Sequence, residues 1–131
     1  MKIEFYKYQA TGNDFIIIDN RNQDINLSEE NIRFLCDRHF GIGSDGLIIF
    51  GNSDKADFSM QFFNPDGSGG MMCGNGGRSI VKFAADKDII KERCCFIAPD
   101  GLHFATIKDN IVSLKMVNPT LFQAHEDGYY I

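Results

Sequence analysis

The sequence lacks the features that mark membrane, secreted and nucleic-acid-binding proteins. No apolar run approaches the roughly 18 residues that a membrane-spanning helix needs, and the N-terminal residues lack the apolar core of a signal peptide. The 13 Lys and Arg residues are scattered and the formal net charge is −5, which argues against a nucleic-acid-binding surface. We therefore expect a cytoplasmic protein whose partners include neither a membrane nor a nucleic acid.

The sequence also lacks the cysteine patterns of disulfide-rich and zinc proteins. The four cysteines are Cys36, Cys73, Cys94 and Cys95. They form no C-x-x-C pair, and the three histidines are distant in sequence from any cysteine pair. We therefore predict reduced thiols and no metal site.

What is present is typical of one soluble globular domain. Hydrophobic residues make up 44% of the 131 residues and charged residues 24%, enough for a real core. Apolar patterns predict strands. The predicted strands are Ile3–Tyr8, Phe15–Ile18, Leu47–Phe50, Asp57–Phe63, Cys94–Ala98, Leu102–Lys108 and Ile111–Met116. The run Phe15–Ile18 is unbroken, so both its faces should be buried, whereas Asp57–Phe63 alternates and should bury one face.

Two helices are predicted. Ser28 has the side chain of an N-cap residue, and Glu29 and Glu30 complement the positive end of the helix that follows. This helix should end before Gly41. A second helix is predicted over Ser79–Lys87 from the spacing of its apolar residues, and its few charges indicate burial on most sides.

The fifteen residues from Asn64 to Arg78 are the most unusual stretch, because six of them are glycine. Cys73 stands there, at a turn that leads into the second helix. Unpaired amides and the helix macrodipole at such a turn lower the pKa of a thiol and bind a carboxylate, and glycines let the backbone approach a ligand closely. Cys73 is therefore a candidate proton-transfer group at a carbon beside a bound carboxylate. The alternative is a buried structural cysteine in a flexible loop.

Two other anion-binding motifs fit less well. A phosphate-binding G-x-x-x-x-G-K-[ST] loop would need glycine at Met72 and lysine at Arg78. A phosphatase-like loop has the right residue types in Cys73–Ser79, but its spacer of four residues is one residue too short. A non-catalytic module that binds a carboxylate is a further alternative.

Three blocks of the sequence resemble the diaminopimelate epimerase family in order and spacing. The blocks are Gly12–Phe15, then Arg38–Gly46, then Phe63–Ser68 together with Cys73–Arg78. The resemblance covers essentially the whole chain. Its Cys-Gly-Asn-Gly and Gly-Asn-Asp-Phe forms favour this family over proline racemases and phenazine-biosynthesis-like isomerases of similar fold. It implies an α+β fold in which a mixed β-sheet wraps around a central helix that starts near Gly74, as one lobe of a two-lobe protein.

The resemblance also implies a chemistry. This is the cofactor-independent epimerisation of LL-diaminopimelate to meso-diaminopimelate, in lysine and cell-wall precursor biosynthesis, by two cysteines without pyridoxal phosphate. Cys73 corresponds to the first catalytic cysteine, and the substrate-binding positions correspond to Asn13, Asn64, Gly74 and Asn75. The implied partner is a small-molecule amino acid, with homodimer formation left open. Another amino-acid racemase or isomerase of the same fold is the alternative.

The second cysteine of this mechanism has no candidate in the sequence. Cys94 and Cys95 are not followed by glycines, and Cys36 lies in a predicted helix, so all three are interpreted as structural. Residues 1–117 then correspond to the first lobe. Residues 118–131 correspond to a connector and the strand-like start of a truncated second lobe. We therefore expect this chain to be inactive on its own.

Overall fold

The computed structural model describes residues 2–71, 74–115, 123–125 and 128–130, the last two ranges by their backbone alone. The elements, in chain order, are β1 (Tyr6–Ala10), β2 (Asn13–Asp19), α1 (Glu29–Cys36), β3 (Gly46–Gly51), β4 (Phe58–Phe63), β5 (Gly69–Gly70), α2 (Gly74–Asp86), β6 (Arg93–Ala98), β7 (Gly101–Lys108), β8 (Ile111–Lys115), β9 (Gln123–His125) and β10 (Gly128–Tyr130). None of the helices described is long and apolar enough to span a membrane.

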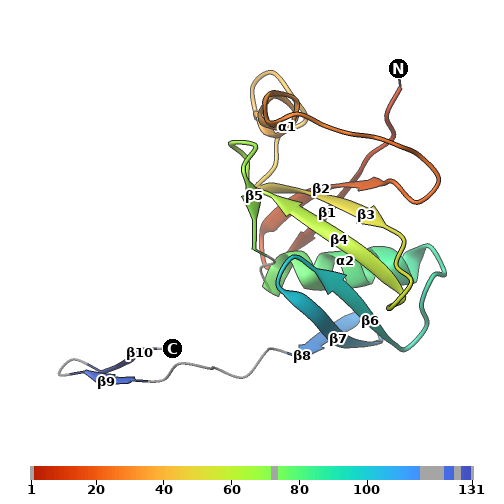
Figure 1. Ribbon diagram of the computed structural model, residues 1–131, viewed down its shortest axis with the longest axis vertical. Coiled ribbons are helices and arrows are strands. Elements are labelled where there is room, and N and C mark those ends of the chain that lie inside the picture. Colours follow the sequence, from red (N-terminus) through yellow and green to blue (C-terminus); the bar gives the residue numbers. More distant parts are fainter. Residues whose placement is uncertain (1, 72–73, 116–122, 126–127, 131) are drawn as a thin grey trace.

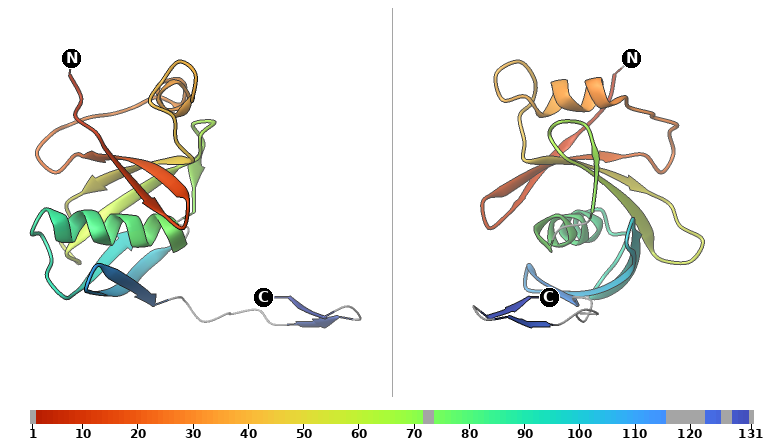
Figure 2. Two further views of the ribbon diagram at one scale, coloured as in Figure 1. Left: turned by 180° about the vertical axis from the view of Figure 1, so that it is seen from behind. Right: turned by 60° about the vertical axis from the view of Figure 1, so that its left-hand side comes forward.

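One curled sheet dominates the fold. Its strand order is β1-β2-β3-β4-β6-β7-β8, and β5 pairs with β4 as the eighth strand. The pairs β2–β3 and β4–β6 are parallel, and the other pairs of this sheet are antiparallel. The sheet bends around α2, with β1 to β4 on one side of the helix and β6 to β8 on the other (Figures 1 and 2). The predicted mixed sheet wrapped around a central helix is confirmed.

Aromatic rings fill the space between the sheet and α2. The ring of Phe58 is stacked between Phe50, at 4.7 Å between centroids, and Phe96, at 5.1 Å. Phe83 of α2 meets Phe50 edge-on at 5.2 Å. All four rings are fully buried, and burying such a side chain contributes about 1.5–3 kcal/mol. The cluster therefore ties α2 to β3, β4 and β6.

The strand β2 is buried on both faces, as its unbroken apolar run predicts. Phe15 and Ile17 belong to the core beside α2, whereas Ile16 and Ile18 pack with Ile32 of α1 on the outer face of the sheet. Because α1 covers that outer face, the strand needs apolar residues at every position rather than at alternate ones.

The helix α1 begins with the predicted N-cap. Ser28 Oγ accepts a hydrogen bond from the N–H of Asn31 at 3.1 Å, and Asn31 Oδ1 accepts one from the N–H of Ser28 at 3.3 Å. The two bonds form a reciprocal capping box. The helix ends at Cys36, before Gly41 as predicted.

Replacing Ser28 with alanine is expected to lower the free energy of unfolding by about 1 kcal/mol, because one N–H of the first turn loses its acceptor. Chemical denaturation followed by far-ultraviolet circular dichroism measures this change. The matched control is Ser28→Asp, which keeps an acceptor and should retain most of the stability. Equal losses in both variants would show that the cap hydrogen bond does not stabilise α1.

The sequence pattern does not predict three features. The helix α2 begins at Gly74, where the resemblance places it, although the apolar spacing predicts a helix only from Ser79. Gly76 and Gly77 are buried, so packing against the sheet outweighs the low helix propensity of glycine. The strand β5 forms inside the glycine-rich stretch, and β9, which pairs with β10, lies within the segment predicted as a connector. The predicted boundary after residue 117 lies outside the described residues.

Candidate functional site

Two predicted site residues, Asn13 and Asn64, lie with Asp45 where three strands meet at one end of the curled sheet. Asn13 is the first residue of β2, and Asp45 directly precedes β3, which runs parallel to β2. Asn64 directly follows β4, which is antiparallel to β3. Neighbouring parallel strands begin at the same end of a sheet, and an antiparallel neighbour finishes at that end. The topology therefore brings these three residues to one end of the sheet.

A series of hydrogen bonds connects this end of the sheet to the first turns of α2. Arg78 Nη2 donates to Asn75 Oδ1, and Asn75 Nδ2 donates to Asn13 Oδ1. Asn13 Nδ2 in turn donates to Asp45 Oδ2 at 3.2 Å. These four residues, which we call the polar chain, run from a guanidinium to a carboxylate and include a bond between residues 62 positions apart.

Arg38 binds the carboxylate end of the polar chain and also Asp14, which Lys7 contacts as well. Arg38 Nη2 donates to Asp45 Oδ1 at 3.0 Å and to Asp14 Oδ1 at 2.8 Å, while Nη1 donates to Asp14 Oδ2 at 3.2 Å. Lys7 Nζ also donates to Asp14 Oδ2, at 2.7 Å. The bonds from Arg38, aided by Lys7, hold the pKa of the Asp14 carboxyl well below its usual range despite partial burial. Asp14 is therefore an anion at neutral pH.

A tight loop fixes the position of Arg38. Gly43 has a φ of 84°, and a Cβ atom at this residue would lie 3.0 Å from both Cα and Cγ of Arg38. Gly41 approaches α1 more closely still, since a Cβ there would lie 1.9 Å from the carbonyl oxygen of Phe34. Only glycine allows these approaches. The glycines of the block Arg38–Gly46 therefore allow this loop to pack closely against the end of α1.

Asn64 belongs to a separate hydrogen-bonded turn. Its Nδ2 donates to Ser68 Oγ at 3.2 Å, and Asp66 Oδ1 accepts from the N–H and the hydroxyl of Ser68 at 2.9 and 2.6 Å. No hydrogen bond between described residues links Asn64 to the polar chain. Of the predicted substrate-binding residues, the structure joins Asn13 and Asn75 directly, while Asn64 only shares their end of the sheet.

Cys73, the predicted catalytic residue, lies outside the described residues. Gly74, which follows it in the sequence, is the first residue of α2. The first turn of an α-helix presents N–H groups and a positive dipole to anions, and that of α2 contains no acidic residue. Gly74 and Asn75 therefore lie where a bound carboxylate is favoured, and their role in holding substrate stays a prediction.

The sequence interpretation assigned no role to Asp14, Arg38 or Asp45. All three lie within the blocks that resemble the family, and the structure joins them to Asn13. Their presence in these blocks was the sequence signal that could have identified them as site residues. Within the described residues, no group of three or more His, Cys, Asp or Glu side chains is placed to hold a metal ion.

The other three cysteines are free thiols, of which Cys36 and Cys94 are buried. Burial raises the pKa of Cys36, partly opposed by a hydrogen bond from Ser44. Burial, together with the nearby carboxylate of Asp57, raises the pKa of Cys94 to about 12. Cys95 is half-buried on the outward side of β6. Thiols with a raised pKa stay protonated at neutral pH, so Cys36 and Cys94 are unsuited to act as bases.

Alkylation at pH 8 should therefore be slow at Cys94. With a pKa of about 12, about one in 10⁴ of these thiols is ionised at pH 8, compared with roughly one in four for an ordinary thiol. We expect Cys94 to react at least about 10²-fold more slowly than Cys95. Mass spectrometry after iodoacetamide pulses of increasing length measures each rate, and similar rates at the two cysteines would contradict the burial argument.

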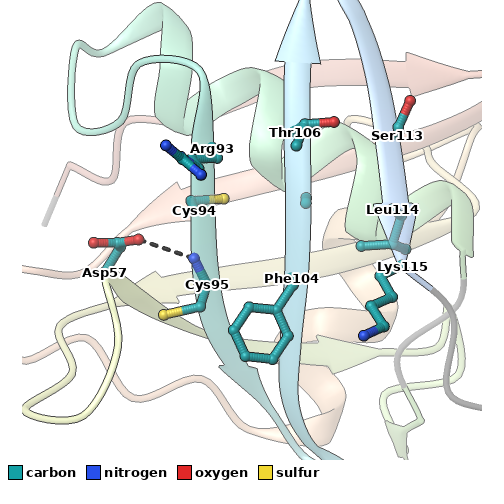
Figure 3. A pocket seen from close by; sticks show the side chains of 10 residues that line it. Asp57, Arg93, Cys94, Cys95, Phe104, Thr106, Ser113, Leu114 and Lys115 are labelled. Atoms are coloured by element: carbon teal, nitrogen blue, oxygen red, sulfur yellow. Dashed lines mark hydrogen bonds between the residues drawn. The ribbon is translucent and has the colours of Figure 1, made fainter.

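A pocket of about 560 Å³ lies along β6, β7 and β8 and contains no residue of the polar chain (Figure 3). Cys95, Phe104 and Lys115 are among its lining residues. Asp57 Oδ2 accepts a hydrogen bond from the N–H of Cys95 at 2.9 Å at one side of the pocket. The pocket therefore adds no residue to the candidate site.

The family model and the curated relatives agree on one family. A family model described as diaminopimelate epimerase matches residues 5–121. A diaminopimelate epimerase from Flavobacterium psychrophilum is 50% identical over 133 residues, which cover 98% of this chain and 51% of that protein. Another, from Bacteroides thetaiotaomicron, is 41% identical over 133 residues, covering 97% of this chain and 50% of that protein. The chain thus spans about half the length of these curated relatives.

Solved structures share the fold at much lower identity. A probable proline racemase from Agrobacterium radiobacter has a TM-score of 0.67 and 16% identity, covering 98% of this chain and 47% of that chain. A hydroxyproline epimerase from Agrobacterium vitis has a TM-score of 0.65 and 13% identity, covering 97% and 46%. These likenesses concern the fold alone. Because the family model matches nearly the whole length, the chain belongs to the diaminopimelate epimerase family.

Proposed function

We propose that the protein containing this chain is an isomerase that epimerises LL-diaminopimelate to meso-diaminopimelate. One observation carries the proposal: the three family-like blocks contribute to a single hydrogen-bonded network at the beginning of α2. Cys73 directly precedes that helix in the sequence. The identity of the proposed substrate is inferred from the relatives, which are named diaminopimelate epimerase.

The proposed reaction needs two proton-transferring groups. The Cys73 thiolate takes the proton from the substrate α-carbon, which breaks the C–H bond and leaves a carbanion. A thiol on the opposite face donates its proton to that carbon, so the centre inverts and the two sulfur groups exchange protonation states. In this proposal the proton is carried by the two thiols, and no pyridoxal phosphate takes part.

The described residues favour binding of the substrate's charged end beside Cys73. Amides in the first turn of α2, those of Gly74 and Asn75, are proposed to hold the α-carboxylate through the N–H groups and the positive helix dipole. The same local field favours the thiolate form of a cysteine at this position. Asn13, which is hydrogen-bonded to Asn75, and Asn64 are proposed to contact the remaining polar groups of the substrate.

The second thiol is proposed to come from the half of the protein beyond this chain. Cys36 and Cys94 have raised pKa values because they are buried, and Cys95 lines the pocket on β6 to β8 rather than the polar chain. Residues 1–117 then form the first lobe, and residues 118–131 form the connector and the start of the second. We further propose a cytoplasmic location and a small amino-acid substrate as partner.

Proton exchange tests this proposal. The full-length protein, incubated with LL-diaminopimelate in deuterium oxide, should place a deuteron on the α-carbon and form the meso isomer, as seen by NMR and chiral chromatography. The 131-residue chain alone should do neither, because it lacks the second thiol. Turnover by this chain would refute the two-lobe requirement, whereas a full-length protein that acts on proline or hydroxyproline instead would refute the substrate.

A further inference from the structure

Arg38 has an unusual combination of exposure and contacts. Its side chain is 55% exposed, yet its guanidinium donates hydrogen bonds to two different carboxylates. Ion pairs at such exposed positions contribute little to stability. The contact with Asp45 matters for another reason, because Asp45 is the carboxylate end of the polar chain.

We propose that Arg38 is a positioning residue, which holds Asp45 so that the amide of Asn13 keeps one orientation toward the substrate. The inference rests on the proposed function only in naming that ligand. Arg38 occupies Oδ1 of Asp45, which leaves Oδ2 for the N–H of Asn13. The backbone N–H of Asp14 donates to the same Oδ2 at 3.2 Å and keeps that oxygen in place.

Charges at the two ends give the polar chain a single direction. An asparagine amide has two orientations that exchange its oxygen and its nitrogen. A carboxylate only accepts hydrogen bonds, so Asp45 selects the orientation in which Asn13 Nδ2 faces it. A guanidinium only donates, so Arg78 selects the orientation in which Asn75 Oδ1 faces it. The two amides then meet as acceptor and donor, and the second N–H of each has a defined direction.

Removal of Arg38 weakens this selection at the Asp45 end of the polar chain. Asp45 is 40% exposed, so without its cationic partner the carboxylate gains freedom to turn toward water. The orientation of the Asn13 amide then depends mainly on its bond from Asn75, so the amide turns more readily to the orientation that presents its oxygen to the ligand. A negatively charged carboxylate of the ligand would then face the amide oxygen of Asn13 where it otherwise meets an N–H donor. The expected loss is therefore in substrate binding more than in the proton-transfer step.

Steady-state kinetics of the full-length protein test the proposal. Arg38→Met should raise KM for diaminopimelate at least about tenfold with a smaller change in kcat. The KM of Arg38→Lys should lie between those of the wild type and of Arg38→Met, because an ammonium keeps the charge but cannot make the guanidinium's two parallel hydrogen bonds. The matched control is Arg21→Met. Arg21 forms a similar pair with Asp19, with bonds of 2.9 and 2.8 Å, at the other end of β2, and its loss should leave KM unchanged.

The side-chain amide signal of Asn13 in ¹⁵N-labelled full-length protein gives a readout that needs no turnover. Arg38→Met should shift or broaden this signal. The amide of Asn20, bonded to the backbone of Ile25 at 2.9 and 3.1 Å, should stay unchanged. An unaltered Asn13 signal, or an equal rise in KM for the Arg21 control, would overturn the positioning role. If the wild-type protein shows no α-proton exchange, the proposed function fails, and the Asn13 signal alone decides the inference.

Discussion

Replacing Cys73 with alanine in the full-length protein should abolish α-proton exchange, with a rate loss of roughly 10³-fold or more. General acid–base groups contribute about 10²–10⁴-fold to a rate, and in the proposed mechanism no group other than Cys73 removes the α-proton of LL-diaminopimelate. Cys73→Ser should be nearly as inactive, because a hydroxyl is far harder to ionise than a thiol. Deuterium incorporation from deuterium oxide measures the loss.

The control for this experiment is Cys95→Ala. Cys95 is half-buried and does not belong to the polar chain, so its removal should leave exchange unaffected. Circular dichroism of each variant must match the wild type, so that unfolding does not explain the loss. Exchange that survives in a folded Cys73→Ala variant would remove the sulfur from the mechanism.

Replacing Phe58 with alanine should lower the free energy of unfolding of this chain by about 3–5 kcal/mol. The ring is fully buried and stacks on both Phe50 and Phe96, so its loss leaves a cavity that its neighbours fill only in part. Such a change is a large fraction of the roughly 5–15 kcal/mol that holds a typical domain folded. Urea denaturation followed by circular dichroism measures it.

Phe104→Ala is the matched comparison, because the same side chain lies on the outward face of β7 and is 50% exposed. Its removal should cost less than about 1 kcal/mol. Similar losses for Phe58 and Phe104 would show that the stacked rings do not carry the packing between the sheet and α2.

Elements with strong local signals could be predicted from the sequence. The N-cap Ser28 and the doubly buried run Phe15–Ile18 each depend on residues close together in the chain, and both are confirmed. The start of α2 could not be predicted in the same way. Its first turn is rich in glycine, which disfavours helix locally, and its helical form depends on contacts with distant strands.

The candidate site shows the same division. Asp14, Arg38 and Asp45 lie in the family-like blocks, but the sequence did not predict that these three residues contact one another. That pairing depends on the parallel register of β2 and β3, which places Phe15 opposite Gly46, and no local pattern encodes such a register. Asn13 and Asn75 were predicted as neighbours of one ligand, and the structure adds the bond between them. The assignment of Cys73 stays a prediction.

The bond between Asn13 and Asn75 also has a consequence for folding order. It joins residues 62 positions apart, so it forms only after the loop entropy of the intervening chain has been lost. The β1–β2 hairpin can form early from neighbouring residues, but on its own it has only part of the polar chain. A partly folded molecule in which only this hairpin has formed should therefore lack affinity for the ligand. Ligand binding should then indicate that the sheet has closed around α2.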